Sequence, residues 1–344
     1  MLKLQGSHGT ALGGLILSLV LSVMSGCAWL DTKQRQLIYR PTPGVPAHFT
    51  GLREGDEQFF LPVPATSGTN SAGEAPIASA NASAAASPPP APQRIEMWWL
   101  PHADPKAPTL LYLHGTFRTL VANVRKIEAL RTAGFSVLAV EYRGWGLSTP
   151  IIPSERTIVQ DADIAWAEFV RREPRPQQRF IFGHSMGSGV AVDLASRQSP
   201  QSDYAGLILE SAFTSFPDIA IEVSGVAGLI ALSSDERFAS IDKIKRVEQP
   251  LLMMHGKLDK TVPMVLGERL FAAANPPKTW VMIDDGRHSD LDEKGREQYQ
   301  QAVRQFKATA LARAASPGAQ ASKSLAPPGN SAASAAPPPR QGVQ

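Results

Sequence analysis

The chain has 344 residues, of which 43% are hydrophobic and 19% are charged. This balance fits one globular domain with accessory segments and excludes a wholly disordered chain. A formal net charge of +3, without runs of Lys or Arg, argues against nucleic acid as a partner. The only cysteine is Cys27, so an intrachain disulfide cannot form.

The first 26 residues contain one charged side chain, that of Lys3. An uncharged stretch follows Lys3, and its apolar centre at Ala11–Met24 is shorter than the roughly 20 residues that span a bilayer. Small residues then precede Cys27, and together these features resemble a bacterial lipoprotein signal peptide, in which the cysteine after the cleavage site is lipidated. The alternative is a secretory signal followed by an ordinary buried cysteine. The resemblance implies an exported lipoprotein, and Ala28 after the cysteine implies anchoring to the outer membrane, facing the periplasm.

Composition divides the rest of the chain into segments. We expect an N-terminal linker and a first edge strand over residues 27–64, and the folded domain over residues 94–314. The insertion at 65–93 and the tail at 315–344 consist largely of Ala, Ser, Gly, Asn and Pro. Such segments bury too little apolar surface to offset the entropy of ordering, so we expect both to be disordered.

Within the domain, short apolar runs alternate with longer helical patterns. This alternation is typical of a parallel sheet buried on both faces, and right-handed crossovers place helices on both sides. Upstream, Phe49–Val63 and Arg94–Leu100 predict an antiparallel hairpin at the sheet edge, with the insertion at its tip. The other predicted elements, in order, are strand Thr109–Leu113, helix Leu120–Ala133, strand Phe135–Glu141, helix Thr157–Arg172, strand Arg179–Phe182, helix Gly187–Arg197, strands Leu207–Leu209, Leu251–His255 and Trp280–Ile283, and helix Glu293–Ala314.

A Gly-x-Ser-x-Gly motif follows one of these strands and opens a helix. It reads Gly183-His184-Ser185-Met186-Gly187. A turn this tight needs small residues two before and two after the serine, and it exposes the hydroxyl above the sheet. The helix N-terminus behind the serine favours developing negative charge. The context therefore predicts that Ser185 is a catalytic nucleophile.

A serine hydroxyl needs a base and an orienting acid to act as a nucleophile. In parallel sheets with a serine turn of this kind, they follow later in the chain, in the order Ser, Asp, His. Asp259 follows the predicted strand Leu251–His255, and His288 follows the strand Trp280–Ile283. The competing acids Asp284 and Asp285 lie too near His288 in sequence to come from the preceding strand's exit loop. We therefore predict a catalytic triad of Ser185, Asp259 and His288.

Two backbone N–H groups are needed to bind the oxyanion of the reaction. One is expected from Met186, directly after the nucleophile, and the other from Thr116 after the first core strand, with Phe117 as the alternative. His114 and His184 are expected to hydrogen-bond the loops around the nucleophile, and His255 to be a residue at the edge of the core.

Taken together, the motifs resemble a branch of the α/β-hydrolases that includes serine-aminopeptidase-like hydrolases and protein depalmitoylases. The resemblance covers residues 36 to about 306. It rests on the sequences Leu37–Pro41, Tyr112–Gly115, Glu141–Ser148, Gly183–Gly187, His255–Asp259 and Gly286–His288. It implies an α/β-hydrolase fold, with a mostly parallel central sheet, helices on both faces and a small cap segment over residues 211–249. The fold serves esters, thioesters and amides alike, so the resemblance leaves the substrate open.

The segment 211–249 is rich in apolar side chains, and it is either part of the core or a lid that lines an acyl pocket. We expect a lipid-anchored hydrolase of small carboxylic esters or thioesters, acting through an acyl-enzyme. The alternatives are an aminopeptidase, for which Glu210 and Asp218 are the nearby carboxylates, and a non-catalytic periplasmic binding lipoprotein. No phosphate loop or metal-ligand spacing is present in the sequence, so we expect no metal and no cofactor. The sequence does not indicate an oligomeric state.

Overall fold

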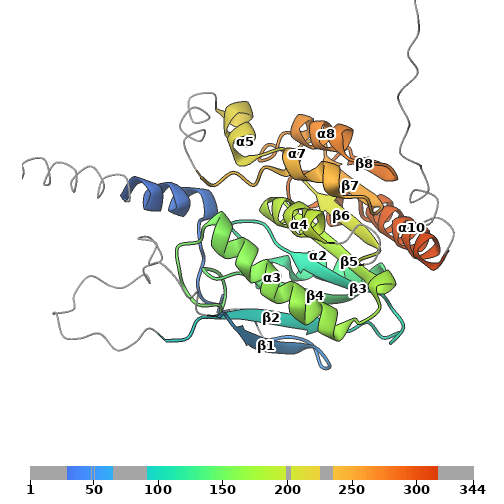
Figure 1. Ribbon diagram of the computed structural model, residues 1–344, viewed down its shortest axis with the longest axis horizontal. Helices are drawn as coiled ribbons and strands as arrows, with labels where there is room; N and C mark the ends of the chain where they lie inside the picture. Colours follow the sequence, from blue (N-terminus) through green and yellow to red (C-terminus); the bar gives the residue numbers. More distant parts are fainter. Residues whose placement is uncertain are drawn as a thin grey trace, which may run out of the picture.

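A twisted sheet forms the centre of the molecule (Figure 1). The computed structural model describes residues 29–47, 49, 51–64, 91–198, 203–224 and 235–316. Within these ranges the sheet has eight strands in the order β1-β2-β4-β3-β5-β6-β7-β8. They are β1 (Glu57–Pro62), β2 (Arg94–Leu100), β3 (Thr109–Leu113), β4 (Ser136–Glu141), β5 (Arg179–His184), β6 (Gly206–Glu210), β7 (Leu251–Gly256) and β8 (Lys278–Ile283).

The pairing of the strands follows their residue patterns. β1 pairs antiparallel with β2, and β2 with β4, whereas the pairs from β4 to β8 are parallel. The central strands β3, β4 and β5 are buried at every position, as their continuous apolar runs predict. β1 at the edge alternates between exposed and half-buried residues. The mostly parallel sheet predicted from the sequence is confirmed.

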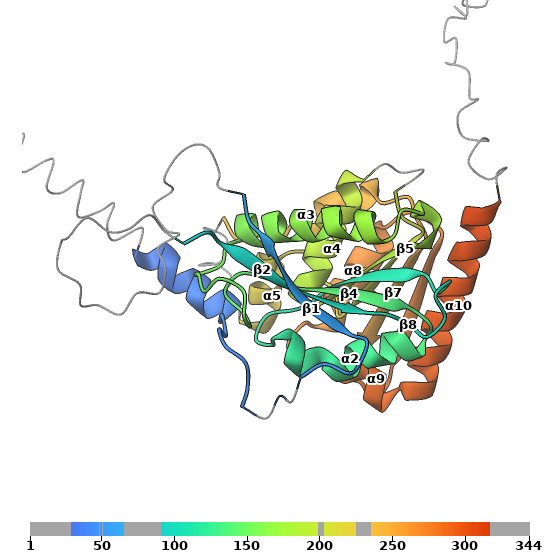
Figure 2. The same cartoon turned by 90° about the horizontal axis from the view of Figure 1, so that it is seen from below.

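Helices cover both faces of the sheet (Figure 2). On one face, α3 and α4 pack against strand residues such as Leu111 and Leu113. On the other face, α2 and α10 pack against the alternate residues, Leu110 and Tyr112. The helices are α2 (Leu120–Thr132), α3 (Glu155–Arg172), α4 (Met186–Arg197), α5 (Phe216–Val223), α7 (Ser240–Lys243), α8 (Met264–Ala273), α9 (Leu291–Lys294) and α10 (Arg296–Ala315), with short 3₁₀ turns at Pro176–Gln178 and Ile244–Arg246.

Three parts of the fold differ from the sequence-based expectation. The predicted strand Phe49–Val63 is shorter, because only Glu57–Pro62 pairs with β2, while Phe49 stacks on Trp98 at 5.6 Å between ring centroids. The predicted helix Glu293–Ala314 is divided into α9 and α10 at Gly295. A Cβ at Gly295 would lie 2.6 Å from a carbon of Ile283, so the chain passes too close to β8 for a larger residue.

The third difference is a set of helices that the sequence analysis did not predict. The expected N-terminal linker contains a helix over residues 29–39, and α5, α7 and α8 were also not predicted. The predicted cap segment 211–249 contains α5 and α7, while residues 225–234 lie outside the described ranges.

Several predictions concern segments that are not described. The signal peptide with Cys27, most of the insertion at 65–93 and most of the tail at 315–344 lie outside the described residues. The ends of the insertion are described, and the backbone N–H of Val63 donates to the carbonyl of Gln93 at 2.8 Å. The insertion therefore joins the two strands of the β1–β2 hairpin, as expected.

Candidate active site

Ser185 occupies the turn between β5 and α4. Its backbone has φ 55° and ψ −125°, a conformation that residues with a side chain rarely adopt. The turn is packed tightly on both sides, because a Cβ at Gly183 would lie 2.3 Å from the carbonyl oxygen of Gly187. At Gly187 the same atom would lie 2.0 Å from the carbonyl oxygen of Leu113. Both glycines of the motif are thus required by close backbone approach.

The structure brings the three predicted side chains together. His288 Nε2 lies 2.9 Å from Ser185 Oγ, and His288 Nδ1 lies 2.9 Å from Asp259 Oδ2. The competing acid Asp284 instead pairs with Lys257 at 3.2 Å, in an exposed ion pair. A hydroxyl, an imidazole and a carboxylate in this order can move the serine proton to His288 and stabilise the imidazolium that forms.

Asp259 is fixed in its ionised form. Its Oδ1 accepts hydrogen bonds from the backbone N–H groups of Thr261 and Val262, each at 2.9 Å. Burial raises the pKa of Asp259, but the interactions with His255 and His288 outweigh it and hold the pKa well below its usual range. His255 Nε2 lies 3.5 Å from Oδ2 and 3.0 Å from the carbonyl of Val262, so it mainly orders this turn.

Two side chains fix the loop that carries His288 by hydrogen bonds to its backbone. His184 Nε2 donates to the carbonyl of His288 at 2.8 Å, and the hydroxyl of Ser211 donates to the same oxygen at 3.2 Å. Burial lowers the pKa of His184 well below its usual range, and the charge of Lys126 lowers it further. His184 is therefore neutral, and it orders the loop as the sequence analysis expected.

A buried ion cluster lies beneath this loop. Lys126 on α2 contacts Glu210 at the end of β6 and Asp292 on α9, the latter at 3.1 Å. Glu210 also accepts the backbone N–H of Ser185 through its carbonyl, at 2.9 Å. The cluster links the serine turn, α2 and α9. The sequence analysis did not include Lys126, because a lysine in an amphipathic helix is usually a surface residue.

The loop after β3 lies directly against Ser185. A Cβ at Gly115 would lie 2.9 Å from the Cβ of Ser185, so this loop approaches the serine closely. His114 Nδ1 lies 2.6 Å from the carbonyl of Gly115, and its Nε2 lies 3.0 Å from Glu141 without the alignment of a hydrogen bond. Thr116 follows in the loop, and Met186 begins α4, where the first N–H groups of a helix lack helical partners.

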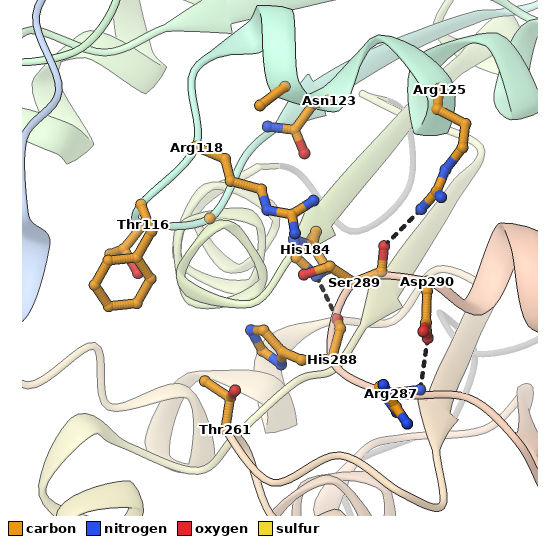
Figure 3. A pocket seen from close by; sticks show the side chains of 13 residues that line it. Thr116, Arg118, Asn123, Arg125, His184, Thr261, Arg287, His288, Ser289 and Asp290 are labelled. Carbon is orange, nitrogen blue, oxygen red and sulfur yellow. Dashed lines mark hydrogen bonds between the residues drawn. The ribbon is translucent and has the colours of Figure 1, made fainter.

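A cavity of about 630 Å³ opens beside His288 (Figure 3). It lies between the loop 115–118 with the start of α2 and the loop 287–290. Its lining consists of Gly115, Thr116, Phe117, Arg118, Ala122, Asn123, Arg125, His184, Thr261, Arg287, His288, Ser289 and Asp290.

The two carboxylates considered for an aminopeptidase do not face this cavity. Glu210 is completely buried in its contact with Lys126. Asp218 accepts hydrogen bonds from the hydroxyls of Thr214 and Ser215, at 2.5 and 2.7 Å. Neither is placed to bind the free ammonium group of a peptide.

The aromatic residues of the predicted cap belong mainly to the core. Phe213 and Phe238 are almost fully buried, and both pack against Phe216 at 5.1 Å between ring centroids. Of the two interpretations of this segment, the described residues therefore favour core over acyl pocket. In the ranges that the structure covers, no cluster of His, Cys, Asp or Glu could hold a metal ion. No helix there is long and apolar enough to cross a membrane.

Comparison with known proteins agrees with this fold. The model of the family described as serine aminopeptidase, S33, matches residues 104–238. An uncharacterized protein of Mycobacterium tuberculosis is 30% identical over 295 residues, which are 85% of this chain and 93% of that protein. A lysophosphatidylserine lipase of Danio rerio is 32% identical over 197 residues, 53% of this chain and 51% of the lipase. The chain thus spans about half of that relative.

Solved structures show the same architecture. An esterase of Pyrococcus furiosus superposes with a TM-score of 0.51 at 17% identity, over 64% of this chain and 87% of the esterase. A Penicillium α/β hydrolase gives the same score at 15% identity, over 64% of this chain and 96% of that one. The sheet, the serine turn and these similarities define a hydrolase fold. The chain belongs to the α/β-hydrolase superfamily.

Proposed function

We propose that this protein is a serine hydrolase that cleaves carboxylic esters or thioesters through an acyl-enzyme on Ser185. The observation that carries the proposal is the continuous chain of contacts from Ser185 to His288 to Asp259, with both distances at 2.9 Å. A lipase among the relatives and an esterase among the structural neighbours support the same reaction class.

In the proposed mechanism, His288 Nε2 takes the proton of Ser185 as Oγ attacks the carbonyl carbon of the substrate. Asp259 stabilises the imidazolium, and the backbone N–H groups of Thr116 and Met186 bind the oxyanion. His288 then donates the proton to the leaving group, which departs as an alcohol or thiol. Water, activated by the same imidazole, hydrolyses the acyl-enzyme and restores Ser185.

An ester substrate fits the site better than a peptide with a free amino terminus. A peptidase of that kind needs an available carboxylate. Glu210 pairs with Lys126, and Asp218 binds two hydroxyls. Asp290, which lines the cavity, accepts the backbone N–H of Arg287. We propose short to medium acyl chains, since each methylene that the bound substrate buries contributes about 0.8 kcal/mol.

The proposed function is tested by labelling and by a substrate series. A fluorophosphonate probe should label the wild-type protein and not Ser185→Ala, whose kcat should fall on the order of 10⁴- to 10⁶-fold. Labelling that persists in a folded Ser185→Ala protein would place the nucleophile elsewhere, and no labelling of the wild type would favour a binding protein. In parallel, p-nitrophenyl esters from acetate to decanoate are compared with aminoacyl anilides. Cleavage of the anilides alone would identify a peptidase.

We further propose that the enzyme is a lipoprotein anchored through Cys27 and exposed to the periplasm. The helix over residues 29–39 begins two residues after this cysteine. Its side chains Trp29, Leu30 and Leu37 are between 58% and 71% exposed, and Lys33 is exposed on the same helix. Exposed aromatic and apolar residues beside a lysine suit a membrane surface, which supports this proposal.

A further inference from the structure

The cavity beside His288 lies where the leaving group of a substrate would extend. Ser185 does not line this cavity, whereas His288 and its neighbours Arg287 and Ser289 do. In the proposed function, on which this inference rests, His288 Nε2 must come within hydrogen-bond distance of the leaving-group oxygen. The rest of the leaving group is attached to that oxygen, so it extends past His288 into the cavity. The side chains of the cavity therefore select the leaving group.

Three arginines line this cavity, and one of them is already neutralised. Arg125 Nε donates to Asp292 at 3.0 Å, and the same guanidinium contacts Glu293 and the carbonyl of Ser289. This arginine binds the loop that follows His288 to α2 and α9. It has a structural role, and its charge is not available to a ligand.

The other two arginines lie on opposite walls and carry uncompensated charge. Within the described ranges, the guanidinium groups of Arg118 and Arg287 form no ion pair and no side-chain hydrogen bond. The one carboxylate in the lining is Asp290, which forms no ion pair with any described residue, and its Oδ1 accepts the backbone N–H of Arg287 at 2.6 Å. Arg118 extends its guanidinium into the cavity toward His184 and Ser289 (Figure 3).

The rest of the lining is polar and would not favour an acyl chain. Phe117 and Ala122 are the only apolar side chains among the lining residues, whereas Thr116, Thr261 and Ser289 contribute hydroxyl groups. An apolar chain would leave these groups without hydrogen bonds, but an anion can accept them.

We propose that this cavity is an anion subsite, in which Arg118 and Arg287 bind a phosphate or carboxylate on the leaving group. The substrate class is then an ester or thioester of an uncharged acyl chain with an anionic alcohol or thiol. Guanidinium groups match these oxyanions because they donate parallel N–H bonds.

The test compares two esters that differ only in charge, 1-butyrylglycerol 3-phosphate and 1-butyrylglycerol. The wild-type protein should show a kcat/KM at least tenfold higher for the phosphorylated ester, and this preference should decrease as salt screens the exposed arginines. A dodecanoyl pair distinguishes a lipid from a small soluble substrate, because only a lipid substrate predicts a further rise with chain length. Whether or not the dodecanoyl esters are cleaved faster than the butyryl esters, a preference for the charged member of each pair supports the subsite.

Charge-neutralising variants test which arginines cause the preference for the phosphorylated ester. Arg118→Gln and Arg287→Gln should each lower kcat/KM for the phosphorylated ester about tenfold, mainly through KM, and leave the neutral ester within about twofold. Arg296→Gln, which changes an arginine outside this cavity, is the matched control and should alter neither rate. Arg118→Lys should restore part of the preference because it keeps the charge.

Failure of the subsite is distinguishable from failure of the proposed function. Equal rates for both esters, or losses that are equal for both substrates in the variants, would overturn the anion subsite while the hydrolase stands. If neither ester is hydrolysed, Ser185→Ala protein is titrated calorimetrically with glycerol 3-phosphate. Binding to Ser185→Ala that is lost in the double variant Ser185→Ala/Arg118→Gln supports the subsite. Absence of binding to Ser185→Ala overturns it.

Discussion

At the scale of single residues, Asp259 is the side chain that orients the proposed base. Its Oδ1 accepts two backbone N–H groups, so Oδ2 is left to face His288 Nδ1. Asp259→Asn keeps the size of the side chain, but the amide favours the His288 tautomer that cannot accept the serine proton. We therefore expect kcat to fall about 10⁴-fold. Steady-state ester hydrolysis measures this loss, with circular dichroism to show that the fold is kept.

Asp284→Asn is the matched control for this prediction. The Asp284 side chain is 72% exposed and pairs with the exposed Lys257, so its loss should leave kcat within about twofold. An inactive Asp284→Asn protein beside an active Asp259→Asn protein would show that the acid is assigned to the wrong residue.

His184 gives a second prediction, for stability against pH. Its pKa is lowered well below the usual value by burial and then by Lys126, while in the unfolded chain it is about 6.5. Below about pH 6.5 the unfolded state takes up a proton that the native state does not. The free energy of unfolding should therefore decrease by about 1.4 kcal/mol per pH unit from this residue alone. Stability attributable to His184 is present above pH 6.5 and is lost on acidification.

The measurement is urea unfolding of the wild type and of His184→Gln at pH 7, 6 and 5. Most other groups titrate alike in both proteins, so the difference between them isolates His184. The wild type should lose stability more steeply than the variant across this interval. Parallel pH dependences would contradict a neutral, buried His184.

At the scale of elements, the packing of β5, the serine turn and α4 depends on the absence of side chains. Gly187→Ala would place a methyl group 2.0 Å from the carbonyl oxygen of Leu113, between α4 and β3. Neither partner can move without disturbing the sheet, so we expect a loss of several kcal/mol in the free energy of unfolding. Thermal unfolding of the purified variant, or its failure to accumulate in soluble form, measures this effect.

The neighbouring Ser188 provides the control. Its buried hydroxyl has no hydrogen-bond partner in the described part of the protein, so Ser188→Ala removes an unsatisfied polar group and should not destabilise. A Gly187→Ala protein as stable as Ser188→Ala would show that α4 can shift away from β3.

The elements that could be predicted are those whose pattern is local. Strands such as β3 and β4 are buried on both faces, so a short apolar run identifies them without knowledge of their neighbours. Ser185 and Asp259 follow two such strands, β5 and β7, whereas His288 follows the edge strand β8, whose residues are mostly half-buried.

The features that could not be predicted depend on contacts between distant segments. Lys126 is buried only because Glu210, 84 residues later, and Asp292 lie beside it. Gly295 divides α9 from α10 because Ile283 lies against it, although the helical pattern continues through it. The charge of the cavity likewise depends on which arginine Asp292 and Glu293 neutralise, which no linear pattern reveals.

At the scale of the whole molecule, the N-terminal helix over residues 29–39 ends close to the cavity beside His288. Tyr39 near its end donates a hydrogen bond to Glu236 and packs against Phe216 of α5, at 6.1 Å between ring centroids. The next residue, Arg40, places its guanidinium 4.7 Å from the centroid of the Phe117 ring, beside the cavity. The C-terminal end of the helix is thus packed against the domain, whereas Trp29 and Leu30 at its start are exposed.

This arrangement gives the prediction for the anchor. Each acyl methylene buried in a bilayer contributes about 0.8 kcal/mol, so several chains on Cys27 would hold the protein firmly at a membrane. Cys27→Ser should abolish incorporation of labelled fatty acid, impair processing of the signal and reduce the fraction that sediments with membranes. The side chains of the proposed site come from residues after 114, so any soluble Cys27→Ser protein should keep its kcat/KM toward a small soluble ester. Wild-type protein recovered soluble from the periplasm, cleaved but without lipid, would contradict the anchor, and the exposed Trp29 and Leu37 would then need another partner.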